Sequence, residues 1–134
     1  MKGKRILVVD DEPLIRKLVT DFLKKEGYST IEAEDGRKAL EIFSNEQDID
    51  LVILDVMLPE YDGWTVCREM RKKSRIPIMM LTARGEEFDE IFGLDIGADE
   101  YIAKPFSPNI LIARVNAILR RAESIENNDS KEFN

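Results

Sequence analysis

The sequence predicts a doubly wound α/β fold, in which helices cover both faces of a five-stranded parallel sheet. Short apolar segments alternate with longer amphipathic segments five times along the 134 residues, which is the pattern of repeated β-α units. Several of the short segments are apolar throughout, as strands are when both faces of a sheet are covered. The length corresponds to one domain that can bury a core without disulfides.

The first two units have clear helix boundaries. A strand is expected at residues 5–9, and Pro13 suits the first turn of the helix that follows. Apolar side chains recur at helical spacing up to Gly27, which is a favourable helix end. A second strand is expected at residues 28–33, and Asp35 can cap the next helix.

The third and fourth units follow the same pattern. The run at residues 51–54 is apolar throughout, and a loop with Pro59 and Gly63 leads into a helix. A fourth strand is expected at residues 76–81, and the helix after it ends at Gly97. These boundaries keep each strand short and each helix amphipathic.

The fifth unit completes the domain. A short strand is expected at residues 101–103, and Pro108 begins the last helix. Right-handed crossovers leave few arrangements for five such units, and the flavodoxin-like strand order 2-1-3-4-5 is the natural one. We expect the domain to span residues 1–121 and the polar residues 122–134 to form a disordered tail or the start of a linker.

Composition excludes several kinds of chemistry. The chain has no histidine and a single cysteine, Cys67, so neither a histidine-based catalytic triad nor a disulfide framework is possible within it. The net charge of −7 is unfavourable for direct DNA binding. No apolar run approaches the ~20 residues of a membrane span, and no signal peptide is recognisable. We therefore expect a cytoplasmic protein.

Polar side chains stand where the predicted strands end. Asp10 and Asp11 follow the first strand, Asp55 the third, Thr82 the fourth and Lys104 the fifth. The carboxyl ends of parallel strands lie at one edge of a sheet, which is where ligands bind in this architecture. We therefore expect three carboxylates, a hydroxyl and an ammonium group to converge.

Such a group of side chains favours phosphoryl chemistry with a divalent cation. Two carboxylates ~4 Å apart repel by about 4 kcal/mol at an effective dielectric constant of 20, so three need a cation. Oxygen ligands suit Mg²⁺. Beside the ion, Asp55 would be aimed as a nucleophile at phosphorus, while Lys104 neutralises phosphoryl oxygens and Thr82 donates a hydrogen bond.

Each residue also has an ordinary structural explanation. An aspartate after a strand is usually a turn or cap residue, and Asp11 or Glu12 could cap the first helix. Thr82 could begin a turn, and Lys104 could be a solvated lysine. These explanations do not account for five such residues on the appropriate strands.

The motifs that contain these residues resemble the receiver domain family of two-component response regulators. The resemblance covers residues 4 to about 121. Its matching stretches are Ile6–Glu12, Asp50–Pro59 with Asp62 and Gly63, Pro77–Ala83, Gly97–Tyr101 and Lys104–Phe106.

The resemblance implies a role for each site residue. Asp55 is the phosphoacceptor, and Asp11, Asp55 and the backbone carbonyl of Met57 are ligands of Mg²⁺, with Asp10 in the same acidic pocket. Lys104 pairs with the phosphoryl group. The domain would catalyse its own phosphorylation and a slow dephosphorylation, without turnover of an external substrate.

The resemblance also implies a conformational switch. Thr82 moves to the phosphoryl group, and the ring of Tyr101 turns inward into the space that Thr82 leaves. An ordinary half-buried tyrosine on a strand is the alternative explanation for Tyr101. The Lys104–Pro105 peptide bond is expected to be cis.

Within the family, the chain is most similar to the OmpR/PhoB winged-helix transcription factors. Their receivers form homodimers through the fourth helix, fifth strand and fifth helix. The corresponding residues are Glu90, Asp95, Asp99, Glu100, Ile110, Arg114 and Arg121. Glu90 and Ile110 depart from the usual basic and acidic residues at their positions. The loss of an exposed ion pair changes little energetically but can change the choice of partner.

Three other functions have partly similar sequence requirements. A phosphatase of the haloacid dehalogenase type needs a second aspartate two residues after the nucleophile, where this chain has Met57. A nucleotide-binding protein needs a first loop that attracts phosphate, whereas Asp10, Asp11 and Glu12 repel it. A receiver-like docking module that takes no phosphate is the third.

These observations predict a phosphorylation-activated receiver domain. A sensor histidine kinase would donate the phosphoryl group to Asp55 with Mg²⁺, and the dimer face would transmit the change. Transcription would be controlled through an effector domain absent from this chain, which alone would contact DNA, and no membrane is involved. The alternative is a single-domain regulator that acts by docking on a protein.

Overall fold

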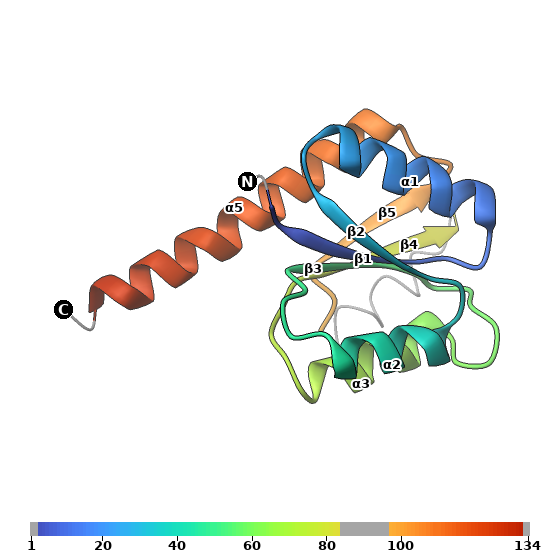
Figure 1. The fold of residues 1–134 in the computed structure, drawn as a ribbon, viewed down its shortest axis with the longest axis horizontal. Coiled ribbons are helices and arrows are strands. Elements are labelled where there is room, and N and C mark those ends of the chain that lie inside the picture. Colours follow the sequence, from blue (N-terminus) through green and yellow to red (C-terminus); the bar gives the residue numbers. More distant parts are fainter. Residues whose placement is uncertain (1–2, 84–96, 133–134) are drawn as a thin grey trace.

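The computed structural model describes residues 3–83 and 97–132, and side chains as far as residue 124 (Figure 1). The helix expected before Gly97 lies outside these residues, as do Glu90 and Asp95 of the predicted dimer face. The elements are β1 (Arg5–Val9), α1 (Pro13–Lys25), β2 (Ser29–Ala33), α2 (Gly36–Asn45), β3 (Leu51–Asp55), α3 (Gly63–Arg71), β4 (Ile78–Ala83), β5 (Glu100–Lys104) and α5 (Pro108–Glu132).

The five strands form one parallel sheet in the order β2-β1-β3-β4-β5, which confirms the predicted topology. Helices α1 and α5 cover one face of the sheet, and α2 and α3 cover the other (Figure 1). In the register, Val9 lies beside Leu54 and Asp55 lies beside Leu81. The ends of the three central strands are therefore level, which brings the residues that follow them to one edge.

An apolar layer on each face holds the helices to the sheet. The layer under α1 and α5 includes Ile6, Ile53 and Leu111, and the layer under α2 and α3 includes Leu7 and Met70, all of them fully buried. Burial of one such side chain stabilises the fold by about 1.5–3 kcal/mol. In the described ranges no helix is long and apolar enough to cross a membrane.

Local signals explain where most elements begin. The Asp35 carboxylate accepts the backbone N–H of Lys38 at 2.7 Å, and the Asp62 carboxylate accepts that of Thr65 at 2.8 Å, so both aspartates cap helices. The fourth strand differs from the prediction, since β4 begins at residue 78 rather than 76. Pro77 lacks an N–H group for the ladder, so regular pairing begins only after it.

The last helix is longer than predicted. Residues 122–134 are predicted to be a disordered tail or the start of a linker; in the structure α5 continues to Glu132, and its distal part extends away from the sheet (Figure 1). The physical reason is that no glycine or proline follows Pro108 in α5. A helix that is already nucleated extends by one hydrogen bond per added residue until a breaker stops it. The domain boundary at residue 121 remains a prediction.

Arg71 at the end of α3 ties together two connections at the amino-terminal edge of the sheet. Its guanidinium donates to the carbonyls of Gly97 at 2.9 Å, Ser74 at 3.2 Å and Ile76 at 2.6 Å, and to the Asp99 carboxylate at 2.5 Å. Gly97 has a φ of +101°, and a Cβ there would lie 2.8 Å from Arg71 Cγ. Glycine is thus required for this approach. The contact fixes the backbone that leads into β5.

Arg71→Ala is expected to lower the free energy of unfolding by about 2–3 kcal/mol, because several backbone carbonyls and one carboxylate lose their donor. Arg68→Ala is the matched control, since Arg68 lies on the same helix and is exposed; its loss should stay below about 0.5 kcal/mol. Urea unfolding of both variants measures the difference. Equal small losses would contradict the structural role of Arg71.

Candidate functional site

Three carboxylates meet at the carboxyl edge of the sheet. Asp10 follows β1, Asp11 is the next residue, and Asp55 is the last residue of β3. One oxygen of each lies within 4.8 Å of the other two. Asp10 is fully buried, Asp55 is 4% exposed, and Asp11 is exposed to solvent. The structure thus brings together the three acidic residues that the sequence placed at this edge.

Lys104, the last residue of β5, reaches these carboxylates from the other side of β4. Its Nζ donates to Asp10 Oδ2 at 3.0 Å and to Asp55 Oδ2 at 3.1 Å, and it lies 3.7 Å from Glu12 Oε1. The Lys104–Pro105 peptide bond is cis, the isomer that the resemblance implies. The single ammonium group therefore bridges two buried carboxylates on neighbouring strands.

The site shifts the pKa values of two of its groups. Burial raises the pKa of Asp55, and repulsion by Asp10 raises it further, while Lys104 and the Met57 N–H act in the opposite direction. Burial lowers the pKa of Lys104, but its hydrogen bonds and attraction to Asp10 and Asp55 outweigh burial, so this pKa is raised overall. Lys104 therefore remains a cation, whereas the ionised form of Asp55 is disfavoured by its surroundings.

The start of α3 packs closely against the backbone at Asp55 and Val56. The Met57 N–H donates to Asp55 Oδ1 at 3.1 Å, and the Gly63 N–H donates to the Val56 carbonyl at 2.8 Å. A Cβ on Gly63 would lie 2.4 Å from the carbonyl oxygen of Asp55. Gly63 is needed because the start of α3 packs directly on the end of β3. The carboxylate of Asp55 is thus held in one direction.

The donor set fits a hard divalent cation. Carboxylate oxygens are the ligands that Mg²⁺ prefers, with water and phosphate oxygens completing its shell. Carboxylates outnumber the single ammonium group at this edge, and a divalent ion would offset the excess negative charge. The backbone carbonyl of Met57 remains a predicted ligand.

Thr82 and Tyr101, the predicted switch residues, are both buried and lie on adjacent strands β4 and β5. Tyr101 lies beside Met80 in the register, and both pack into the layer under α2 and α3. Thr82 is two residues beyond Met80, so it points to the same face of the sheet. The ring of Tyr101 lies 6.2 Å from that of Trp64, tilted by 44°.

Two residues at this edge were missed in the sequence analysis. Glu12, interpreted from the sequence as a possible cap and as a residue that repels phosphate, approaches Lys104 at 3.7 Å. Arg16 donates from Nη1 to the Asp10 carbonyl at 2.8 Å and from Nε to Glu32 Oε1 at 3.1 Å. The available signal was the place of Arg16 one turn into the helix, because side chains there point back toward the helix start.

The described residues of the predicted dimer face include internal ion pairs. Glu100 pairs with Arg114 at 3.0 Å, and Asp99 pairs with Arg71 rather than with an arginine of α5. Ile110 is 52% exposed, and Arg121 is exposed as well. Dimerisation therefore stays a prediction.

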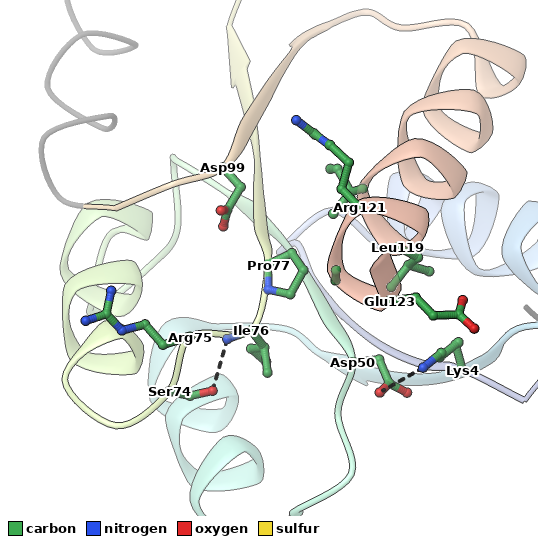
Figure 2. Close-up of a pocket in the computed structure, with 12 residues that line it drawn as sticks. Lys4, Asp50, Ser74, Arg75, Ile76, Pro77, Asp99, Leu119, Arg121 and Glu123 are labelled. Carbon is green, nitrogen blue, oxygen red and sulfur yellow. Dashed lines mark hydrogen bonds and ion pairs between the residues drawn. The ribbon is translucent and has the colours of Figure 1, made fainter. Parts of the chain in front are cut away.

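A cavity of about 480 Å³ lies at the opposite, amino-terminal edge of the sheet (Figure 2). Its walls carry charges of both signs, among them a Lys4–Asp50 ion pair at 4.0 Å. Of the predicted dimer-face residues that the structure describes, Asp99 and Arg121 line this cavity. The acidic group at the carboxyl edge is not part of this cavity.

Asp55→Asn is expected to raise the free energy of unfolding at pH 7 without Mg²⁺ by about 1 kcal/mol, because the amide removes a charge that burial and Asp10 disfavour. A carboxyl whose pKa is higher in the folded state destabilises the fold when ionised. The gain should therefore fade as the pH approaches the unfolded-state pKa of about 3.9. Urea unfolding measures it, with the exposed Asp21→Asn as control. A loss of stability at pH 7 would contradict this sign.

Solved structures share this fold at substantial sequence identity. A CheY-like receiver domain protein from Methanospirillum hungatei JF-1 superimposes with a TM-score of 0.86 at 30% identity, covering 92% of this chain and 98% of that one. The receiver domain of the Francisella response regulator 1452 gives 0.83 at 33% identity, covering 90% and 99%.

Curated relatives are described as transcriptional regulators. The probable transcriptional regulator ycf27 of Porphyra purpurea is 53% identical over 125 residues, 93% of this chain and 51% of that protein. The alkaline phosphatase synthesis transcriptional regulatory protein PhoP of Bacillus subtilis is 53% identical over 122 residues, 90% and 50% respectively. The chain thus spans about half the length of these relatives. Residues 6–116 match the model of the response regulator receiver domain, and the chain therefore belongs to the receiver domain family of two-component response regulators.

Proposed function

We propose that this chain accepts a phosphoryl group on Asp55, with Mg²⁺ bound at the adjacent carboxylates, and that the modification changes the surface around β5 and α5. The single observation that carries the proposal is the geometry of Asp55. Its carboxylate is buried at a strand end, one oxygen is bonded to Lys104 at 3.1 Å, and two further carboxylates lie within 4.8 Å.

The chemistry is an in-line transfer to a carboxylate. An oxygen of ionised Asp55 forms a bond to phosphorus while the bond from phosphorus to the donor, a phosphohistidine nitrogen, breaks and its electron pair stays on the imidazole. Positioning and charge neutralisation carry most of the catalysis in such reactions. Lys104 already lies against Asp55, so its ammonium can neutralise the incoming oxygens without a large movement.

Asp11 and Asp55 would hold the metal directly, with Asp10 and the Met57 carbonyl beside them. Bound Mg²⁺ would supply positive charge to the phosphoryl oxygens. It would also relieve the repulsion between Asp10 and Asp55 that raises the Asp55 pKa, which favours the reactive, ionised carboxylate. Binding of the metal would therefore also favour the ionised, nucleophilic form of Asp55.

The signal would pass through the sheet to its far edge. Thr82 lies on the strand next to β5, in register with Ala103 and one residue short of Lys104. A hydrogen bond from the Thr82 hydroxyl to the phosphoryl group would draw this side chain toward Asp55. The buried ring of Tyr101 packs on the same face of the sheet, so movement of Thr82 changes its packing. This two-state element would bias the β5–α5 surface.

The partners follow from the family and from the surface. A sensor histidine kinase would bring the phosphohistidine, and the exposed Leu14 and Leu18 of α1, close to Asp11 in the chain, offer apolar surface for its docking. The relatives described as transcriptional regulators are about twice as long. We propose that control of transcription, and contact with DNA, belong to an effector domain outside this chain.

Incubation with a small acyl-phosphate donor and Mg²⁺ is expected to add a single phosphoryl group to the wild type and none to Asp55→Asn, as measured by intact mass spectrometry. Omission of Mg²⁺ should abolish the adduct as well. Asp50→Asn is the matched control, because Asp50 lies at the opposite edge of the sheet and its replacement should leave phosphorylation intact.

Two outcomes would contradict the proposal. Retention of the adduct in Asp55→Asn would place the phosphoacceptor elsewhere. The absence of any adduct in the wild type, with circular dichroism showing a folded protein, would instead favour a docking module whose acidic edge binds cations without phosphorylation.

Phosphorylation is expected to convert the chain from monomer to homodimer in sedimentation experiments, and Ile110→Asp should prevent the change. Exposed ion pairs such as Glu100–Arg114 contribute only about 0–1 kcal/mol, so the exposed Ile110 would supply much of the association energy. Leu14→Asp, on α1, is the control and should still dimerise. A phosphorylated wild type that stays monomeric at high concentration would contradict the predicted dimerisation.

A further inference from the structure

Arg16 fixes the loop that carries the acidic residues after β1. Its Nη1 donates to the carbonyl oxygen of Asp10 at 2.8 Å, and its Nε donates to Glu32 Oε1 on β2 at 3.1 Å. Only 17% of the Arg16 side chain is exposed. A guanidinium presents its donors in a rigid plane, so these two bonds hold it in one orientation. Arg16 thereby links α1 to the ends of both β1 and β2.

This contact acts on Asp11 more than on Asp10. The Asp10 carbonyl belongs to the planar peptide group that leads into Asp11, so fixing its oxygen sets the direction in which the chain enters Asp11. The Asp10 carboxylate is already held by the Glu12 N–H at 2.9 Å and by Lys104 at 3.0 Å. The Asp11 carboxylate is exposed and, among the residues that the structure describes, accepts no hydrogen bond.

We propose that Arg16 is a positioning residue for the divalent cation: it holds the peptide before Asp11 so that this carboxylate faces the metal, and Glu32 holds Arg16. The inference rests on the proposed function, since it assumes that Mg²⁺ binds at the three carboxylates. A carboxylate that already points in the direction needed to bind the metal loses less conformational freedom when the metal binds. Groups that orient metal-binding side chains therefore commonly affect the affinity for the metal ion.

The sign of the effect separates positioning from simple electrostatics. As a cation near the site, Arg16 repels Mg²⁺, so removal of its charge alone would tighten metal binding. Positioning predicts the reverse, a weaker affinity in a more negative pocket. Lys17, the next residue on α1, provides the comparison, because its exposed ammonium bonds to Asp21 away from the carboxylates.

Calorimetric titration of the unphosphorylated chain with Mg²⁺ alone tests the proposal. Arg16→Gln is expected to raise the dissociation constant about 10-fold, whereas Lys17→Gln should leave it equal to or below that of the wild type. Arg16→Lys keeps the charge but loses the rigid two-point contact, so it should also weaken binding. Glu32→Gln should raise the dissociation constant less, because Arg16 keeps its bond to Asp10.

A second measurement separates positioning from general damage. With an acyl-phosphate donor, the Mg²⁺ concentration for half-maximal phosphorylation of Arg16→Gln should rise, while the rate at saturating Mg²⁺ stays within about twofold of the wild type. Arg16→Lys gives the same comparison if the glutamine variant does not fold.

The outcomes are distinct. A wild type that binds no Mg²⁺ overturns the proposed metal site and this inference with it. Binding by the wild type that is lost in Asp11→Asn but unchanged or tighter in folded Arg16→Gln and Arg16→Lys overturns only the positioning role.

Discussion

Two carboxylates of like charge are buried side by side at the ends of the two central strands, and most of the site is arranged around that constraint. Val9 lies beside Leu54 in the register, so the residues that follow them, Asp10 and Asp55, are neighbours across adjacent strands. Asp10 is fully buried, and Asp55 is 4% exposed. At a separation of ~4 Å such charges repel by about 4 kcal/mol at an effective dielectric constant of 20. One ammonium group, that of Lys104, contacts both and offsets part of this cost.

Buried carboxylates also need hydrogen-bond donors at fixed positions around them. The N–H groups of Glu12 and Met57 each donate to one carboxylate, and Gly63 lets α3 begin against the end of β3. This arrangement holds the Asp55 carboxylate in place but leaves its charge incompletely compensated. Burial of an incompletely compensated charge lowers the stability of the fold at this edge, as is common at functional sites.

The sequence analysis predicted the strand order and the convergence of Asp10, Asp55 and Lys104 because both follow from short-range patterns. A strand end is visible as an apolar run followed by a charge, and parallel pairing brings all such ends to one edge. The contacts of Arg16 and Arg71 were not predictable in this way. Both look like ordinary polar residues on helices, and their partners are backbone carbonyls, which every residue has. The length of α5 was missed because polar composition suggested disorder where the chain merely lacked a helix breaker.

The two edges of the sheet differ in how far their acidic groups are paired with basic ones, and the net charge of −7 does not show this difference. At the amino-terminal edge, acidic groups have basic partners: Arg5 bonds to Glu46 at 2.8 Å and to Asp48 at 2.6 Å, and Arg71 bonds to Asp99. At the carboxyl edge, Lys104 pairs with Asp10, Glu12 and Asp55, and Asp11 lies beside them. Ion pairs at the amino-terminal edge hold the segments that connect helices and strands. The excess of negative charge at the carboxyl edge attracts positive charge. A cation bound among these carboxylates would meet that demand and lower the cost of burying Asp55 in its ionised form, so the proposed metal site and the proposed phosphoacceptor depend on the same excess of negative charge.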